Sequence, residues 1–208
     1  MKNGYNWKNI QLPFSNLYVA QQLYKEIPSC SIVNYAILNS LRCWNYFPLD
    51  PSIQGYANVA AFGIDGCNSM LIGESMNTDE LCFIITGDLA FFYDMNALWN
   101  TNLGPNLRIL LLNNGGGEIF HTLPGLEMSG TSHKFITAVH KTSARGWAEE
   151  RGFLYQKVED EVQLEEAMAM FTQPEPMTHP VLVEVFTNKN KDARILKDYY
   201  HKNKRNDK

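Results

Sequence analysis

The sequence predicts a doubly wound α/β domain, a three-layer sandwich whose mainly parallel sheet has about six strands. Helical and strand patterns alternate along the chain. The two clearest strands, residues 81–86 and 107–113, are almost continuous apolar runs, as expected of strands covered on both faces. A helical segment and Gly104-Pro105 separate them, so we expect a βαβ unit with parallel strands and a right-handed crossover.

The first part of the chain begins with a helix. Residues 15–26 carry apolar residues at helical spacing behind Ser15, a suitable N-cap, and Pro28 ends that helix. The remaining elements predicted before residue 81 are a strand at 30–38, a short helix at 41–47, a weaker strand at 53–59 and a helix at 65–76.

A helix of roughly ten residues is expected between the two clearest strands. Residues 121–140 show no pattern that assigns them to a helix or a strand. A helix follows at 142–152 with Thr142 or Ser143 as its cap. The last predicted elements are a strand at 153–158, a helix at 162–171, a strand at 181–186 and a closing helix at 192–202.

Residues 12–200 form the predicted domain, between an N-terminal extension (1–11) and a flexible basic tail (201–208). The net charge of −4 argues against nucleic acid as the main partner, because phosphate backbones select basic faces. No apolar run has the length of a membrane span and the N-terminus lacks a signal-peptide pattern, so we expect a cytoplasmic protein. The four cysteines form no CxxC pair and are expected to be reduced thiols.

Polar residues follow both of the clearest strands. Asp88 comes directly after the first strand, and Asn114 opens a glycine run, 115–117, after the second. Because ligands bind at the carboxyl edge of an open parallel sheet, we expect these residues to face one crevice. Their oxygen atoms suit Mg²⁺ that also takes phosphate and water ligands, and the N–H groups of Leu89 and Ala90 suit phosphate. The alternatives are a helix N-cap for Asp88 and a flexible turn for the glycine run.

Several stretches resemble a known family. Gly-Asp at 87–88, followed after 24 residues by Asn-Asn at 113–114, is similar to the thiamine-diphosphate motif of 2-oxoacid decarboxylases and their relatives. Almost the whole chain resembles the C-terminal cofactor domain of the 2-succinyl-5-enolpyruvyl-6-hydroxy-3-cyclohexene-1-carboxylate synthases of menaquinone biosynthesis. The segments that carry this resemblance are GYANVAAFGIDGCNSMLIG (55–73), GDLAFFYDMNALWN (87–100) and NNGGGEIFHTLPG (113–125).

The resemblance implies a site for thiamine diphosphate and Mg²⁺. The side chains of Asp88 and Asn114 and the carbonyl oxygen of Gly116 would hold the metal ion. The other implied cofactor contacts are Asn39, Ser40, Gly63, Ile64, Gly87, Leu89, Ala90 and Ile119. The implied substrate pocket comprises Ser40, Arg42, Ile119, Phe120 and Leu123.

Two of these residues have more specific implied roles. The Gly63 carbonyl would accept a hydrogen bond from the aminopyrimidine of the cofactor. Ile64 would hold the cofactor bent, so that its amine reaches the reactive thiazolium carbon. A position in the hydrophobic core is the alternative for both Ile64 and Phe120.

The implied reaction is decarboxylation of 2-oxoglutarate and transfer of the resulting carbanion to isochorismate. Val59 and Trp44 stand where the family has arginines, and Arg42 lies nearby in the sequence. Because both substrates are anionic and arginine is a bidentate partner for carboxylates, these differences leave open a different 2-oxoacid. A non-catalytic α/β module that has kept the fold is a further alternative.

In this family the glutamate that activates the cofactor belongs to a separate pyrimidine-binding domain. No such domain precedes residue 12, so we expect a fragment of a longer protein or one subunit of a split enzyme, inactive alone. The apolar surface that would meet the missing domain should be exposed. We therefore expect a homo-oligomer or association with a partner.

Overall fold

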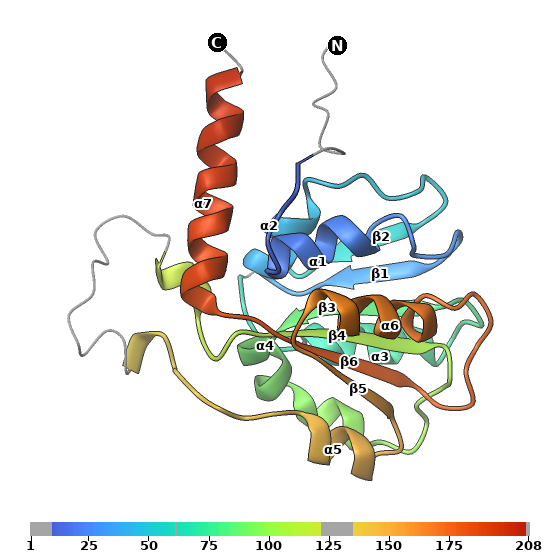
Figure 1. The fold of residues 1–208 in the computed structure, drawn as a ribbon. Helices are drawn as coiled ribbons and strands as arrows, with labels where there is room; N and C mark the ends of the chain where they lie inside the picture. The colour runs from blue at the N-terminus through green and yellow to red at the C-terminus, as the bar shows by residue number, and fades with distance from the viewer. Residues whose placement is uncertain (1–9, 61, 122–134, 207–208) are drawn as a thin grey trace.

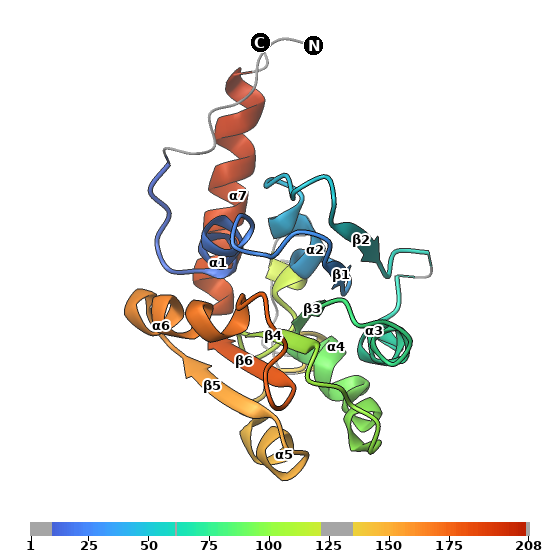
Figure 2. The same cartoon turned by 90° about the vertical axis from the view of Figure 1, so that its right-hand side faces the viewer.

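The computed structural model describes residues 10–60, 62–121 and 135–206. Its centre is a six-stranded, entirely parallel sheet with the strand order β2-β1-β3-β4-β6-β5. Helices lie on both sides of the sheet (Figures 1 and 2). The predicted three-layer α/β fold is confirmed. The strands are β1 (Ile32–Tyr35), β2 (Gln54–Ala57), β3 (Cys82–Gly87), β4 (Leu107–Asn113), β5 (Leu154–Val158) and β6 (Val181–Phe186).

The helices follow the predicted order. The α-helices are α1 (Asn16–Leu23), α2 (Asn39–Trp44), α3 (Cys67–Ser75), α4 (Asp88–Tyr93), α5 (Arg145–Glu150), α6 (Glu161–Phe171) and α7 (Lys189–Asn206). Two short 3₁₀ helices are η2 (Met95–Trp99) and η3 (Glu118–His121). The predicted N-cap of the first helix is confirmed, because the Ser15 hydroxyl accepts the N–H of Tyr18 at 3.2 Å.

Two hydrophobic clusters cover the two faces of the sheet. Along β3, Phe83 and Ile85 pack with residues of α1, α2, α6 and α7, whereas Cys82 and Ile84 pack with residues of α3, α4, η2 and α5. Successive side chains of a strand point to opposite faces, so an unbroken apolar run supplies both clusters. This explains why the two central strands carry no polar face in the sequence.

The strand register sets the position of the site. In the β3–β4 pair, Gly87 lies opposite Leu112. Asp88 and Asn114 therefore leave the sheet at the same edge, each within two residues of that pair. The expectation that they face one region is confirmed, and it depends on β3 and β4 being neighbours in the sheet.

Several predicted elements are shorter than expected, and for two of them the structure gives a clear reason. The strand predicted at 30–38 is confined to β1, because Cys30 and Leu38 adopt positive φ angles of 63° and 62° and end the extended backbone. The helix predicted after β3 ends at Tyr93, and η2 continues it. The break coincides with Asp94, whose carboxylate accepts the N–H groups of Asn68 and Ser69 at 2.8 and 2.7 Å and so caps α3 instead.

The predicted cap of the helix at 142–152 is wrong. The N-cap of α5 is Ala144, and its N–H donates to the carboxylate of Glu184 at 3.1 Å. The Ser143 hydroxyl donates to the same carboxylate at 2.7 Å and accepts the N–H of Arg145 at 3.1 Å. A buried residue of β6 therefore caps this helix, which no local sequence pattern indicates.

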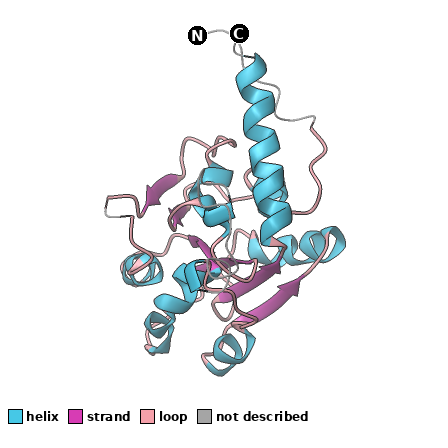
Figure 3. Cartoon of the chain, turned by 90° about the vertical axis from the view of Figure 1, so that its left-hand side faces the viewer, coloured by secondary structure: helices cyan, strands magenta, loops and turns pink. Residues whose placement is uncertain are grey.

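The C-terminal helix is longer than predicted. α7 runs from Lys189 to Asn206 and projects away from the body of the domain (Figures 1 and 3). Most of the segment expected to be a flexible tail is therefore helical. Within the described ranges, no helix combines the length and the apolar character that crossing a lipid bilayer requires.

Candidate functional site

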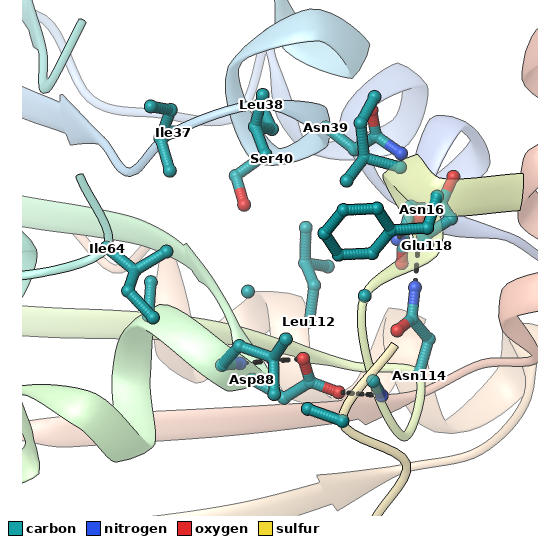
Figure 4. A pocket seen from close by; sticks show the side chains of 18 of the residues that line it. Asn16, Ile37, Leu38, Asn39, Ser40, Ile64, Asp88, Leu112, Asn114 and Glu118 are labelled. Carbon is teal, nitrogen blue, oxygen red and sulfur yellow. Dashed lines mark hydrogen bonds between the residues drawn. The ribbon is translucent and has the colours of Figure 1, made fainter. Parts of the chain in front are cut away.

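A cavity of about 360 Å³ opens at the carboxyl edge of β1, β3 and β4 (Figure 4). Most of the predicted site residues line it: Asn39, Ser40, Ile64, Gly87, Asp88, Leu89, Ala90, Asn114, Gly116, Ile119 and Phe120. Gly63 and Arg42 are not among its described lining residues. Leu123 lies outside the described residues. The structure thus brings together side chains from four separate segments of the chain.

Asp88 is held by the backbone of the opposite loop. Its Oδ2 accepts the N–H groups of Gly115 and Gly116 at 2.8 and 2.9 Å, and its Oδ1 accepts the N–H of Leu89 at 2.7 Å. Gly87, not Asp88, is the N-cap of α4, so the simple capping interpretation is not what the structure shows. The carboxylate instead joins the ends of β3 and β4.

The backbone conformation of the loop after β4 requires glycine at positions 115 and 116. Gly115 and Gly116 have φ angles of +77° and +138°, which residues with side chains rarely adopt. A Cβ atom on Gly116 would lie 2.5 Å from the carbonyl oxygen of Thr137. The loop is further held by the N–H of Gly117, which donates to that same oxygen at 2.7 Å. The glycine run is therefore a turn of defined conformation in which two N–H groups donate to Asp88.

The two asparagines after β4 differ in their surroundings. Asn113 points into the protein, where its Nδ2 donates to Glu184 Oε1 at 2.7 Å and to the Thr142 carbonyl at 2.8 Å. Asn114 lines the cavity, and its Nδ2 donates to Glu118 Oε2 at 2.9 Å. Figure 4 shows the nitrogen of Asn114 turned to Glu118 and its oxygen on the side of Asp88.

The donor atoms of this edge fit a hard divalent cation. The Asp88 carboxylate, the Asn114 amide oxygen and the carbonyl of Gly116 are all oxygen ligands of cavity-lining residues. The described residues contain no group of three or more His, Cys, Asp or Glu that could hold a metal ion. A single carboxylate suits Mg²⁺, which retains water and phosphate ligands, better than a calcium or zinc site built from protein alone.

The rest of the cavity is largely apolar. Ile37, Leu112, Ile119 and Ile136 contribute to its walls. The amide of Asn39 is buried at this wall, and its hydrogen bond to the Glu118 carboxyl opposes the rise in the pKa of Glu118.

Several residues at the site were not predicted. His140 Nε2 lies 3.1 Å from Asp88 Oδ2. The ammonium of Lys189, at the start of α7, donates to the Gly115 carbonyl at 2.9 Å. Burial lowers the pKa of Lys189, and the Asp88 carboxylate opposes that shift. His140 falls in a segment without a recognisable pattern, whereas Lys189 could have been considered because it follows a strand that ends at the same edge.

Glu118 and Asn16 are further polar residues of the cavity wall that were not predicted. Glu118 is 5% exposed, and its Oε2 accepts the side-chain amides of Asn16 and Asn114. Burial, reinforced by the carboxylate of Asp192, raises the pKa of Glu118 to about 8. Burial also raises the pKa of Asp192 to about 6. The sequence feature that could have indicated Glu118 as a site residue is its position between the glycine run and an apolar pair.

The positions that lack the family arginines do not form part of the cavity wall. Trp44 is buried in the core, where its ring lies 5.8 Å from that of Tyr35. Val59 is 42% exposed. No arginine or lysine is among the described residues that line the cavity. The described wall therefore offers no cation for a substrate carboxylate.

Comparison with known proteins identifies relatives of this chain. None of the protein-family profiles matches it. A 2-succinyl-5-enolpyruvyl-6-hydroxy-3-cyclohexene-1-carboxylate synthase from Bacteroides fragilis is 59% identical over 191 residues, which are 92% of this chain and 34% of that protein. The protein of the same name from Bacteroides thetaiotaomicron is 61% identical over 188 residues, 90% of this chain and 34% of that protein. The protein of the same name from Phocaeicola vulgatus is 50% identical over 197 residues, which are 93% of this chain and 35% of that protein.

The chain spans about a third of the length of the curated relatives that it matches. Within that third, the identity is high and extends over about nine-tenths of the chain, so it covers every strand of the sheet and the cavity at its edge. Over about nine-tenths of its length the chain is therefore similar, at high identity, to about a third of the 2-succinyl-5-enolpyruvyl-6-hydroxy-3-cyclohexene-1-carboxylate synthases, consistent with a C-terminal domain of those proteins.

Proposed function

We propose that this chain is the thiamine-diphosphate- and Mg²⁺-binding part of an enzyme that decarboxylates 2-oxoglutarate and transfers the resulting carbanion to isochorismate. The observation that carries the proposal is the position of Asp88. Its carboxylate is held by the N–H groups of Gly115 and Gly116 at a cavity that Asn114 also lines. The names of the relatives support the synthase activity of the whole protein.

In this proposal, Asp88, Asn114 and Gly116 hold Mg²⁺, and the start of α4 meets the diphosphate. Gly87 and Ala90 line the cavity there. The N–H of Leu89 donates to Asp88 Oδ1 at 2.7 Å, so it orients that carboxylate and is not free for the diphosphate as expected. Backbone N–H groups at the first turn of a helix have no partner within the helix and favour anions.

When bound, thiamine diphosphate supplies an electron sink that accepts the electron pair left by departing CO₂. The chain's own residues orient and shield the reacting groups. Ile64 lines the cavity together with Ile37 and Leu112, and these apolar side chains exclude water from it. The Gly63 carbonyl accepts the Asn58 amide at 3.1 Å and lies 3.9 Å from the Cys67 thiol, and its contact with the cofactor is proposed from the resemblance alone.

Calorimetric titration tests the cofactor site. We expect thiamine diphosphate to bind the 208-residue chain only when Mg²⁺ is present. The Asp88→Ala variant should lose the Mg²⁺-dependent heat and retain the thermal unfolding of a folded domain. Equal Mg²⁺-dependent binding by the variant and the wild type would refute the ligand assignment. Failure of the full-length protein to bind any diphosphate cofactor would favour the non-catalytic alternative.

A second candidate is a thiamine-diphosphate enzyme that acts on another 2-oxoacid. It is favoured by the absence of arginine and lysine from the described cavity wall and by the core position of Trp44. A panel of 2-oxoacids, assayed on the complete enzyme, separates the two candidates. A preference for 2-oxoglutarate supports the first, and a preference for a small neutral side chain supports the second.

The complete active site is proposed to need a further domain. Large apolar side chains near the cavity are exposed, among them Phe62 at 72% and Phe135 at 70%. Ile136 next to Phe135 also lines the cavity. Exposed apolar clusters mark interfaces. We expect the isolated chain to be inactive and to self-associate, and strictly monomeric sedimentation at high concentration would contradict the second expectation.

A further inference from the structure

Asn114 can present two chemically opposite ends to the cavity. Its amide oxygen is a cation ligand, whereas its NH₂ group is a donor that would repel a cation. In the structure Nδ2 lies 2.9 Å from Glu118 Oε2, and the amide oxygen lies on the side of Asp88 (Figure 4). Which end faces Asp88 therefore depends on the acceptors near the Asn114 amide, which are Glu118 Oε2 and the carboxylate of Asp192.

Glu118 offers an acceptor. Its Oε2 receives two amide donors, Asn114 Nδ2 at 2.9 Å and Asn16 Nδ2 at 3.0 Å. An oxygen with two donors on it has no room for a proton of its own. If the Asn114 amide were flipped, its oxygen would face Oε2, and two acceptors would meet in a buried site. Glu118 therefore favours one of the two orientations, and the Asp192 carboxylate favours the same one.

The position of Glu118 is itself fixed by distant parts of the chain. Asn16 begins α1, and its backbone N–H donates to Asp192 Oδ1 on α7 at 3.1 Å. The hydroxyl of Thr187, just after β6, lies 3.1 Å from the amide oxygen of Asn16. Asn16, Glu118 and Asp192 are at most 5% exposed. The side chain of Asn16 is thereby oriented with its NH₂ group toward Glu118.

We propose that Glu118 is a positioning residue of the metal site, which accepts the amide N–H of Asn114 and so keeps the Asn114 oxygen turned toward the cation beside Asp88. This inference rests on the proposed function. Glu118 is not itself placed as a ligand, because its Oε2 lies beyond Asn114 as seen from Asp88 (Figure 4). Hydrogen-bond partners of this kind typically change metal affinity by about 10–100-fold when they are removed.

The test compares two substitutions in the 208-residue chain. Glu118→Gln keeps an oxygen that can accept the amide of Asn114, whereas Glu118→Leu has a similar volume and no acceptor. Leu164→Ala, at a buried position of α6, is the control for a general loss of stability. Two quantities are measured. One is the dissociation constant of Mn²⁺ with saturating thiamine diphosphate, from the electron paramagnetic resonance of free Mn²⁺.

The second quantity is hydrogen exchange of the Asn114 side-chain NH₂ group by ¹⁵N NMR, without metal, with its signals identified from an Asn114→Ala spectrum. We expect Glu118→Leu to weaken Mn²⁺ binding by about tenfold or more and to accelerate this exchange. Glu118→Gln should remain within about threefold of the wild-type affinity, because its side-chain oxygen still accepts the Asn114 amide. Leu164→Ala should leave both quantities close to wild type.

Unchanged Mn²⁺ affinity in Glu118→Leu, with normal binding by the wild type, would overturn the inference and leave the proposed function intact. An affinity loss in Leu164→Ala as large as that in Glu118→Leu would also overturn it, by showing that stability alone sets the affinity. If the wild type binds no Mn²⁺ with thiamine diphosphate, the proposed function fails, and with it the role of Glu118 at a metal site. Protection of the Asn114 NH₂ group would then mark a purely structural hydrogen bond.

Discussion

Two buried carboxylates flank the same Asn113-Asn114 pair, and they serve different purposes. Glu184 is fully buried, and it accepts the Asn113 amide, the hydroxyls of Ser143 and Tyr155 and the Ala144 N–H. Asp88 is also well supplied with donors, but it lines a cavity. The first carboxylate is sealed among its partners and holds the sheet and α5 together.

The difference shows how two similar hydrogen-bond networks can be distinguished. Asn113 and Asn114 are adjacent in the sequence, yet one amide ties β4 to β6 and the other reaches the cavity. The carboxylate of Glu184 is surrounded by protein donors and has no side that a ligand could reach. The carboxylate of Asp88 is held by backbone N–H groups and also lines a cavity, so a ligand can reach it. The predictions below separate the sealed region from the open one.

The largest expected effect is on the sealed region. Glu184→Ala should lower the free energy of unfolding by about 3–5 kcal/mol, because it leaves several buried donors without an acceptor. Urea denaturation measures the loss. Glu166→Ala, at an exposed position of α6, is the control and should change stability by less than about 0.5 kcal/mol. A loss below about 1 kcal/mol for Glu184→Ala would show that these donors find other partners.

The next effect concerns the loop of the open region. Gly116→Ala should cost about 1–3 kcal/mol, since its φ is +138° and a Cβ atom would lie 2.5 Å from the Thr137 carbonyl oxygen. It should also weaken Mg²⁺-dependent cofactor binding, because the N–H of Gly116 would leave Asp88. Gly146→Ala, within α5 and with open space around it, is the matched control and should be neutral or stabilising. Equal stability of the two variants would contradict the geometry of the loop.

The asparagine pair gives a direct contrast. Asn113→Ala should destabilise the fold by about 1–2 kcal/mol, because Glu184 and the Thr142 carbonyl lose a donor. Asn114→Ala should cost less stability and abolish most of the Mg²⁺-dependent binding. Thermal unfolding and calorimetric titration on both variants measure these effects. The opposite pattern, with binding lost in Asn113→Ala and kept in Asn114→Ala, would reverse the assignment of the two residues.

The most gradual expected effect is a pH dependence of stability that arises from Glu118. Its pKa in the folded protein is about 8, above the value of an unfolded glutamate, so the folded state holds a proton that the unfolded state has lost. The contribution of Glu118 to the free energy of unfolding should therefore be fully present at pH 4. It should fall as the pH rises toward 8, with a slope of at most about 1.4 kcal/mol per pH unit. Glu118→Gln should flatten this slope in urea denaturation measured across the range. Equal slopes for variant and wild type would show that Glu118 is not the titrating group.

Much of the fold and part of the site could be predicted from local patterns. The apolar runs of β3 and β4 indicated buried parallel strands, and the residues after them indicated Asp88 and Asn114. The helix caps were predicted less well, because Glu184 caps α5 and Asp94 caps α3 from positions distant in the sequence. The length of α7 was underestimated for a similar reason, since the polar composition of residues 201–206 resembles that of a solvated tail.

The sequence by itself determined the alternation of helices and strands, the parallel sheet and the polar residues at the ends of its central strands. These follow from the periodicity of apolar residues and from the glycine run, which act over a few residues. Only the tertiary structure decided that Asn113, next to the predicted Asn114, is buried against Glu184 of β6. It also brought Asn16 of α1 and Asp192 of α7 to Glu118 and placed His140 beside Asp88. Such contacts join segments more than 50 residues apart, so the order of strands in the sheet, and not any local pattern, sets them.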